Sequence, residues 1–320
     1  MQEIQDKTED FRSLSGPIAE KDAGKRLDRY LADTHPFLSR SKWRERVLTG
    51  GLRVGGRRVR PSYRVLAHDQ LSMRHIAMEE PPVDKGIYPV WKSGGVIVFF
   101  KPSHLPMHES GPYRENTFSY LLAKNFGKEW SAVHRLDRET SGLVMCASTP
   151  FLRAQLAGDL AGGKVEKEYF AFASGSKKED FFVERGPIGD LVDSTIRIKK
   201  WVVKDGLWAE TWFDVLERKK DKIYLRARPK TGRTNQIRIH AAFNGLPLVG
   251  DKLYHPDEAI FEEYFQNRGN TDHVIEKTGF HRLCLHAARL VFRHPETKKV
   301  CEVFSPLPED MVDYWQRLDS

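Results

Sequence analysis

The 320-residue chain has little of what marks secreted or membrane proteins. Its three cysteines, Cys146, Cys284 and Cys301, are widely spaced and odd in number, so neither a disulfide framework nor a zinc site is indicated. The longest strongly apolar runs, such as VIVFF at residues 96–100, are much shorter than the about 20 residues that span a membrane. The opening MQEIQDKTED lacks the apolar core of a signal peptide. We therefore expect a cytoplasmic protein that is not bound to a membrane.

Positive charge is the most unevenly distributed property of the chain. The net charge is +8, and residues 40–64 alone hold nine basic side chains against one acid, Glu45. The excess of this stretch equals that of the whole chain, so the other residues are neutral overall. Such a concentration of positive charge is typical of a surface that binds a polyanion. The alternative is a basic surface that faces solvent and binds no partner. The nine residues are Arg40, Lys42, Arg44, Arg46, Arg53, Arg57, Arg58, Arg60 and Arg64.

The composition divides the chain into four segments. We expect a flexible tail at residues 1–20, a small basic α/β domain at 21–78, a linker at 79–90 and a large domain at 91–320. The linker prediction rests on the proline-rich stretch EEPPVDKGIYP. In the large domain short apolar strands outnumber helices and often follow one another, which predicts an α+β fold with a mainly antiparallel mixed sheet. The polar stretch 255–280 is predicted to be a surface insertion.

Within the basic domain the pattern predicts two helices and a hairpin. Apolar residues at helical spacing start at Leu27 and end before Pro36, and SRSKWRERVLTGG predicts a second helix with Ser39 or Ser41 as N-cap. In LRVGGRRVR, the pair Gly55-Gly56 predicts a tight turn between two short strands.

The densest group of polar residues is HRLDRETSG, residues 134–142, which precedes a buried-strand pattern. Here Asp137 is expected on a loop at a sheet edge, where catalytic side chains often lie, and Gly142 is expected to permit a tight turn. Taken alone, an aspartate in such a segment is more often a turn or capping residue.

Two further segments carry candidate residues. In TGRTNQIRIH, Thr234 is the predicted N-cap of a short helix, on which Arg238 needs an anionic partner. A structural salt bridge is the alternative for that arginine. In KEYFA, strand alternation places Lys167 and Tyr169 on one face, where ordinary packing is the alternative.

Together these segments resemble a known family. HRLDRETSGLVMCA, KEYFAFASG and PKTGRTNQIRIHAAFNGLPLVGDKLYH occur in the order of the signature segments of the RluA family of pseudouridine synthases, and so do IVFFKPSHLPMHESG and CLHAARLVFRHPETKKVCEVFSPLPEDM. The resemblance covers residues 96–311. Residues 26–73 are similar to the small RNA-binding domain shared by a small-subunit ribosomal protein and bacterial tyrosyl-tRNA synthetases.

The resemblance implies the pseudouridine synthase fold and the isomerisation of uridine to pseudouridine in RNA, without a cofactor or a metal. Both ribosomal RNA and tRNA are open as substrates. We expect a monomer with no obligate protein partner, in which the basic domain supplies RNA affinity and the large domain supplies site choice.

The resemblance also implies roles for individual residues. Asp137 corresponds to the catalytic aspartate, Tyr169 to the active-site tyrosine and Arg238 to the arginine that pairs with the aspartate. We expect Arg238 to hold the ionised Asp137 through a bidentate contact and Tyr169 to stack on the displaced base. Attack on the sugar carbon, attack on the base and assistance of proton removal from the sugar are all open to Asp137. Substrate contacts are expected from Arg135, Arg138, Arg233, Asn235, Arg44, Arg57 and Arg58.

Three positions depart from the family pattern. Asn235 replaces the usual histidine and cannot titrate, His104 stands where glycine is common, and Glu109 stands where proline is common. Other function classes fit less well. A non-catalytic RNA-binding or ribosome-assembly protein would not need Asp137, Tyr169 and Arg238 together. A glycoside hydrolase needs two carboxylates, and Asp251 is interpreted as a turn residue. A nuclease or deaminase needs clustered metal ligands.

Overall fold

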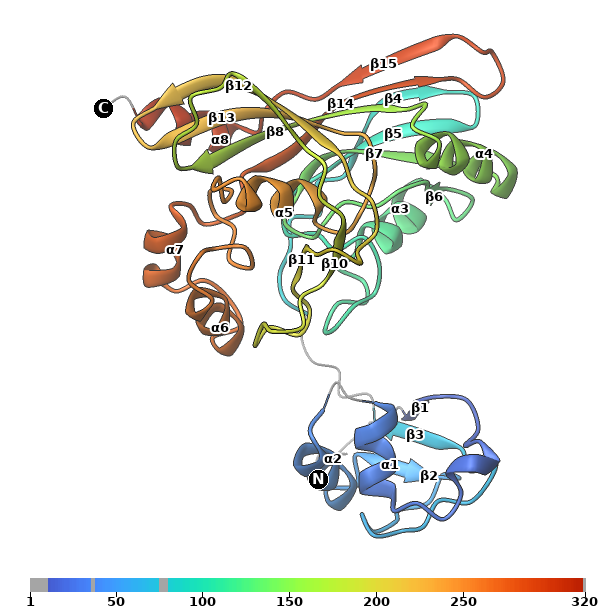
Figure 1. The fold of residues 1–320 in the computed structure, drawn as a ribbon. Coiled ribbons are helices and arrows are strands. Elements are labelled where there is room, and N and C mark those ends of the chain that lie inside the picture. The colour runs from blue at the N-terminus through green and yellow to red at the C-terminus, as the bar shows by residue number, and fades with distance from the viewer. Residues whose placement is uncertain (1–10, 36–37, 75–79, 319–320) are drawn as a thin grey trace, which may run out of the picture. The chain divides into compact units, whose positions relative to one another are not determined.

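The structure, a computed structural model, describes residues 11–35, 38–74 and 80–318. The chain forms two compact units, Met1–Glu79 and Glu80–Ser320 (Figure 1). Among the helices of the described ranges, none is long and apolar enough to cross a membrane.

The first unit combines two helices with a small antiparallel sheet. The sheet has the strand order β1-β3-β2. Both predicted helices form, and Ser39 is the N-cap of the second, because its hydroxyl accepts a hydrogen bond from the Lys42 amide at 3.5 Å. The elements are β1 (Phe11–Ser13), the 3-10 helix η1 (Glu20–Asp22), α1 (Leu27–Thr34), α2 (Arg40–Leu48), β2 (Leu52–Val54) and β3 (Leu71–Arg74).

Two expectations for this unit are wrong. From residue 11 on, the predicted flexible tail is ordered, since Phe11 pairs with Arg74 of β3 and Ile18 is buried; residues 1–10 lie outside the described ranges. The turn at Gly55-Gly56 forms, but residues 57–60 add only one bridge to it and β2 pairs with β3 instead. The segment RRVR, residues 57–60, is mostly arginine and has little apolar surface to bury, whereas β3 supplies the buried Leu71.

The second unit is built on one large mixed sheet. Ten strands have the order β4-β5-β7-β14-β8-β13-β12-β9, with β15 beside β14 and β6 beside β7. Every pairing is antiparallel except β7 with β14, which confirms the predicted α+β fold with a mainly antiparallel sheet.

The strands of this unit are β4 (Tyr88–Ser93), β5 (Val96–Lys101), β6 (Ser131–Ala132), β7 (Ser141–Ala147), β8 (Glu166–Ser174), β9 (Phe181–Glu184), β10 (Ile188–Asp190), β11 (Lys200–Val202), β12 (Thr211–Lys219), β13 (Lys222–Pro229), β14 (Leu285–Arg293) and β15 (Val300–Phe304). The helices are α3 (Phe118–Phe126), α4 (Pro150–Ala161), α5 (Gln236–Phe243), α6 (Ala259–Gln266), α7 (Asp272–Thr278) and α8 (Glu309–Arg317). Strands β10 and β11 form a separate two-stranded sheet, and Ile188 of β10 also bridges to Leu207.

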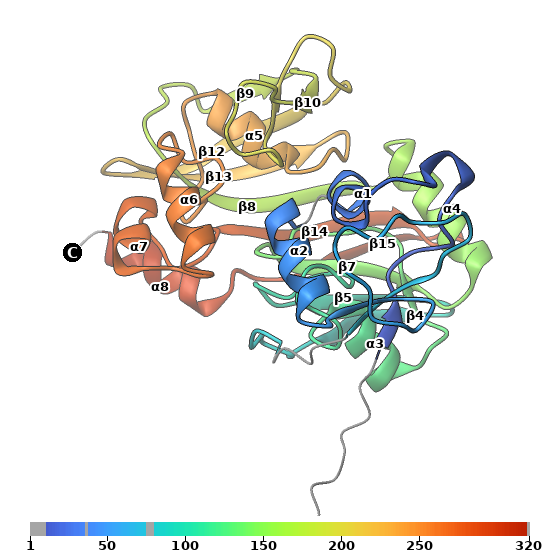
Figure 2. The ribbon, with the colours of Figure 1, turned by 90° about the horizontal axis from the view of Figure 1, so that it is seen from below.

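The middle of the sheet brings the candidate segments together. Strand β14 lies between β7 and β8 (Figure 2), so the loop that precedes β7 lies close to β8. Gly142 makes the approach of β7 to β14 possible. Its φ is +116°, and a Cβ atom there would overlap the backbone of Ala287. The glycine therefore permits a close strand contact rather than the tight turn expected from the sequence.

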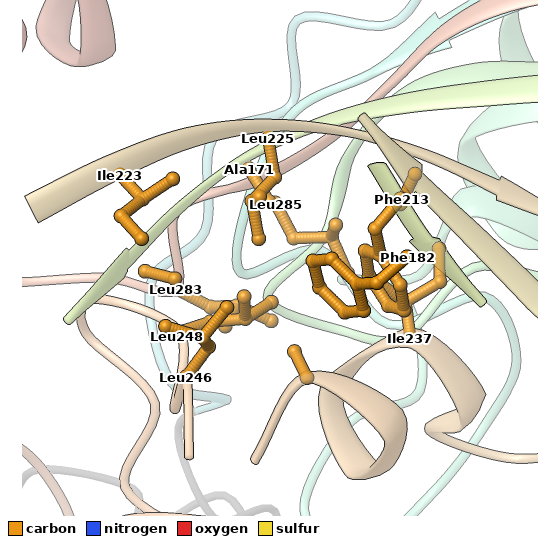
Figure 3. Packing of buried hydrophobic residues seen from close by; sticks show 13 residues of the cluster. Ala171, Phe182, Phe213, Ile223, Leu225, Ile237, Leu246, Leu248, Leu283 and Leu285 are labelled. Atoms are coloured by element: carbon orange, nitrogen blue, oxygen red, sulfur yellow. The ribbon is translucent and has the colours of Figure 1, made fainter. Parts of the chain in front are cut away.

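Helix α5 is fixed to one face of the sheet by an apolar cluster. Figure 3 shows Ile237 of α5 near Phe182 and Phe213, which come from β9 and β12. Burying such side chains contributes about 1.5–3 kcal/mol each. Because Ile237 is anchored in this way, its neighbours on the helix have fixed positions at the sheet surface.

The predicted linker and insertion are both more structured than expected. From residue 80 on, the linker packs on the second unit: the Glu80 carboxylate accepts hydrogen bonds from the amides of Glu115 and Asn116 at 2.9 and 2.7 Å, and β4 begins at Tyr88. The stretch 255–280 contains α6 and α7, and its side chain Ile260 is buried.

Candidate active site

A cleft of about 430 Å³ lies where the candidate segments meet. This volume is in the range of small-ligand pockets. Among the described residues that line the cleft, Asp137 has the one acidic side chain. A site with two carboxylates across a cleft, as a glycoside hydrolase needs, is therefore not present here. The other lining residues of the first loop and of β8 are Val133, His134, Arg135, Leu136, Thr140, Lys167 and Tyr169; those around the start of α5 are Thr231, Gly232, Arg233, Thr234, Asn235, Gln236, Ile237 and Arg238.

Asp137 lies on the loop before β7, as predicted. The amide of Thr140 donates a hydrogen bond to its carbonyl at 3.1 Å, which closes a turn, and the neighbouring Leu136 is buried. The side chain of Asp137 is 24% exposed and lines the cleft. The local fold therefore anchors the backbone and leaves the carboxylate accessible.

Tyr169 enters the cleft from β8. Its cross-strand partners are the small residues Ala227 on β13 and Ala287 on β14, which leave room for the ring. Burial and the negative charge of Asp137 raise the pKa of Tyr169, so the phenol is neutral at ordinary pH. Its hydroxyl makes no hydrogen bond within the described part of the chain.

Arg238 contacts Asp137, but not in the expected way. One hydrogen bond of 3.4 Å joins Arg238 Nη1 to Asp137 Oδ2. The bidentate partner is Asp251, whose two carboxylate oxygens accept from Nε and Nη2 at 2.7 and 2.8 Å. Burial alone would lower the pKa of Arg238, but the charge and hydrogen bonds of Asp251, together with Asp137, raise it above its ordinary value. The guanidinium is therefore a permanently charged group held beside Asp137.

Asp251 is more than the turn residue that the sequence indicated. Its side chain is fully buried, and Oδ1 also accepts hydrogen bonds from the amides of Leu253 and Tyr254, both at 3.0 Å. The preceding Gly250 has a φ of +77° and leaves no room for a Cβ atom. The segment after Gly250 is thus shaped to present one carboxylate to Arg238.

Asn235 links Arg238 to Tyr254. Its Oδ1 accepts from Arg238 Nη1 at 3.0 Å, and its Nδ2 donates to the Tyr254 hydroxyl at 3.1 Å. The Arg238 guanidinium also lies over the Tyr254 ring, 5.0 Å from its centroid. Asn235, with a left-handed φ of 56°, is the N-cap of α5, so the N-cap predicted at Thr234 is wrong by one residue.

The expected substrate-contacting arginines differ in their surroundings. Arg135 and Arg233 are exposed and line the cleft. Arg138 is not among the lining residues. Its guanidinium contacts Glu139 at 3.0 Å and the hydroxyls of Tyr113 and Tyr264, so it joins the loop to α6. In the first unit Arg44, Arg57 and Arg58 are exposed.

Two lysines lie near the cleft, of which Lys101 was missed by sequence reasoning and Lys167 was expected only to share a strand face with Tyr169. Lys101 ends β5 and is completely buried, with Nζ donating to the carbonyls of Pro102, Leu105 and Arg138 at 2.8, 2.8 and 3.1 Å. Burial lowers the pKa of Lys101 to about 7. The signal that indicates such a residue is a lysine directly after the apolar run VIVFF. Lys167 Nζ donates to the Thr231 carbonyl at 3.2 Å, and burial lowers its pKa.

A neutral histidine completes the wall of the cleft. His134 Nε2 accepts a hydrogen bond from the Met145 amide at 3.0 Å. Burial, with the positive charge of Lys167, lowers the pKa of His134 to about 4. In the described ranges no group of three or more histidine, cysteine or acidic side chains is placed to hold a metal ion. The reactive groups that the cleft offers are a carboxylate, a fixed guanidinium and a neutral phenol.

Comparisons with known proteins agree with this arrangement. Residues 95–243 match the RNA pseudouridylate synthase family, and residues 25–71 match the S4 domain. The chain is 30% identical over 316 residues to the uncharacterized RNA pseudouridine synthase YlyB of Bacillus subtilis (strain 168), with 94% of this chain and 96% of that protein covered. It is 31% identical over 317 residues to the ribosomal large subunit pseudouridine synthase D of Yersinia pestis, with 94% and 93% covered.

A solved structure has a similar fold. The human protein RNA pseudouridylate synthase domain containing 4 superposes with a TM-score of 0.55 at 23% sequence identity, and the match covers 72% of this chain and 92% of that one.

Proposed function

The chain belongs to the RNA pseudouridine synthase family, and from that premise we propose that Asp137 catalyses uridine isomerisation in ribosomal RNA without a cofactor. The reaction breaks the bond between uracil N1 and the sugar, turns the base, and forms a new bond from C5, which loses its hydrogen. The observation that carries the proposal is the accessible carboxylate of Asp137 beside a charged guanidinium.

The surroundings of Asp137 support this role. Breaking the glycosidic bond develops positive charge on the sugar, which a carboxylate stabilises or captures. Arg238 contacts Asp137 while Asp251 takes up its other donors, so the carboxylate is oriented without being enclosed. All three modes of action open to Asp137 use its carboxylate, which lies in contact with the fixed positive charge of Arg238.

Tyr169 is proposed to face the uracil. Its ring is held between small residues of the neighbouring strands, and aromatic rings stack well on bases. Its raised pKa keeps the proton on the hydroxyl, so the group is a donor toward the base rather than a general base at ordinary pH.

Substrate contacts are proposed at Arg135, Arg233 and Asn235 around the cleft. The target uridine must leave its stack, which costs a few kcal/mol that backbone contacts offset. The exposed Arg44, Arg57 and Arg58 of the S4 domain are proposed to bind RNA phosphates elsewhere on the substrate.

Ribosomal RNA is the proposed substrate because relatives are named as ribosomal large subunit pseudouridine synthases. A monomer in the cytoplasm is proposed, as expected from the sequence.

The proposal is tested by tritium release from unmodified RNA labelled at uracil C5. We expect release from ribosomal RNA with wild-type protein and none with Asp137→Ala. The control Asp272→Ala, at an exposed position on α7, is expected to keep full activity. Release from tRNA alone would move the substrate to tRNA. A folded wild-type protein that binds RNA but releases no tritium from either pool would indicate a non-catalytic RNA-binding protein.

A further inference from the structure

An exposed tryptophan lies next to the cleft. Trp208 is 53% exposed, and its indole N–H has no hydrogen-bond partner in the described ranges. A tryptophan is usually well buried, because exposing its large ring to water costs free energy. A ring left in water beside a reaction site is therefore informative about what binds there.

Trp208 is joined to the cleft through Arg233. The carbonyl of Trp208 accepts a hydrogen bond from Arg233 Nε at 2.9 Å, and Arg233 lines the cleft. This bond orients the guanidinium at the rim. Arg233 has no acidic partner among the described residues, so its remaining N–H groups are available to an anion.

Hydrogen bonds join the two backbone segments that carry these residues. Gln236 accepts from the Arg233 amide at 3.0 Å and donates to the Glu210 carbonyl at 2.9 Å. The Glu210 amide in turn donates to the Thr231 hydroxyl at 3.1 Å, and the Lys230 amide donates to the Glu210 carbonyl at 2.9 Å. The segment that contains Trp208 and Glu210 is thus joined by hydrogen bonds to the segment that contains Lys230 and Arg233. A preorganised surface loses little conformational entropy when it binds a ligand.

The charge of this rim suits a nucleic acid. Glu210, an acid beside this rim, is already engaged: its carboxylate accepts from Arg185 at 3.2 Å and from the Trp212 indole at 2.6 Å. Arg233 and Lys230 therefore leave a positive surplus. Single-stranded RNA is recognised by this combination, an aromatic ring that stacks on a base and a cation that binds its phosphate.

We propose that Trp208 and Arg233 form a platform for an unpaired base that neighbours the target uridine. The indole stacks on that base while the Arg233 guanidinium binds the adjoining phosphate. The inference rests on the proposed function and deepens it, because it assigns the substrate class: an RNA in which the nucleotide beside the target is unpaired when bound. The platform stabilises the splayed strand that results when the uridine enters the cleft.

The test uses a synthetic RNA hairpin that carries the uridine mapped in ribosomal RNA after reaction with the wild-type protein. Tritium release from this hairpin gives KM and kcat. For Trp208→Ala we expect a KM raised about ten-fold to a hundred-fold, the range of one base–aromatic stack, with kcat within about two-fold. Trp208→Phe, which keeps a smaller ring, is expected to restore most of the affinity. The control Phe265→Ala removes a ring that is 72% exposed on α6, and we expect it to change neither constant.

Hairpins with an abasic nucleotide on the 5′ or the 3′ side of the uridine identify the stacked base. For one of these hairpins, the KM of the wild type is expected to rise by about the same factor as the KM of Trp208→Ala rises on the intact hairpin. The KM of Trp208→Ala is expected to rise little further on that abasic hairpin. An equal rise in KM for wild type and Trp208→Ala on both abasic hairpins would overturn the platform. A Trp208→Ala variant with a lower kcat and an unchanged KM would overturn it too. Absence of tritium release by the wild type would instead contradict the proposed function itself.

Discussion

At the scale of single residues, the two aspartates around Arg238 have different surroundings. Asp251 is buried and bidentate, whereas Asp137 is partly exposed and makes one longer hydrogen bond. A buried carboxylate that satisfies a buried guanidinium is a structural requirement, because removing it leaves an uncompensated charge. The exposed carboxylate is the one available to a substrate.

Matched substitutions separate these roles. Asp251→Asn is expected to lower the free energy of unfolding by about 3–5 kcal/mol and to reduce activity, because Arg238 loses its main partner. Asp137→Asn removes the same charge from the same arginine, yet we expect it to cost about 1 kcal/mol or less and to abolish activity. Urea denaturation and tritium release measure the two effects. Equal losses of stability would contradict this division.

The sequence was informative about positions and less so about partners. The motif segments led to Asp137, Tyr169 and Arg238, and the structure brings these three together. The bidentate partner of Arg238 was predicted wrongly, because which of two carboxylates faces a guanidinium depends on backbone geometry that the local pattern does not contain. Two partners of Arg138 within the protein, Tyr113 and Tyr264, are likewise distant in the sequence, so the local pattern does not identify them.

At the scale of elements, apolar runs predicted the strands well but not their neighbours. Periodicity reports which face of a strand is buried and says nothing of which strand lies beside it. The first unit illustrates this limit, since β2 pairs with β3 and not with the residues directly after its turn. The insertion of β14 between β7 and β8 was likewise outside the reach of local patterns.

The parallel contact of β7 with β14 predicts a sensitive glycine. Gly142→Ala places a Cβ atom against the backbone of Ala287, at a φ that disfavours a side chain. We expect the free energy of unfolding to fall by roughly 4 kcal/mol or more, as measured by urea denaturation. The control Gly158→Ala lies within α4 with no atom near its Cβ, and we expect it to raise stability by about 0.5–1 kcal/mol. A fully stable Gly142→Ala protein would show that β14 does not approach β7 this closely.

At the scale of the whole molecule, charge and chemistry belong to different units. The first unit carries the concentrated positive charge and the S4 domain match, and the second carries the cleft. RNA affinity and catalysis are therefore expected to respond to different substitutions.

Salt dependence tests this separation. Replacing Arg44, Arg57 and Arg58 together by Gln is expected to weaken binding to ribosomal RNA and to reduce the slope of log Kd against log salt by about two to three, if each arginine neutralises one phosphate. The three side chains are exposed, so thermal unfolding should be unchanged. The control Lys277→Gln on α7 should leave the slope as it is. An unaltered slope in the triple variant would place the phosphate contacts elsewhere.

The position of β14 has a consequence for the protein during its synthesis. The first unit is complete once Glu79 has been added, but Leu285 and the rest of β14 emerge from the ribosome much later. Until then β7, which follows the loop of Asp137, and β8, which carries Tyr169, lack the strand that lies between them. A growing chain therefore acquires the basic surface of its first unit long before it has a complete cleft, and RNA modification by that chain can begin only after β14 has been added.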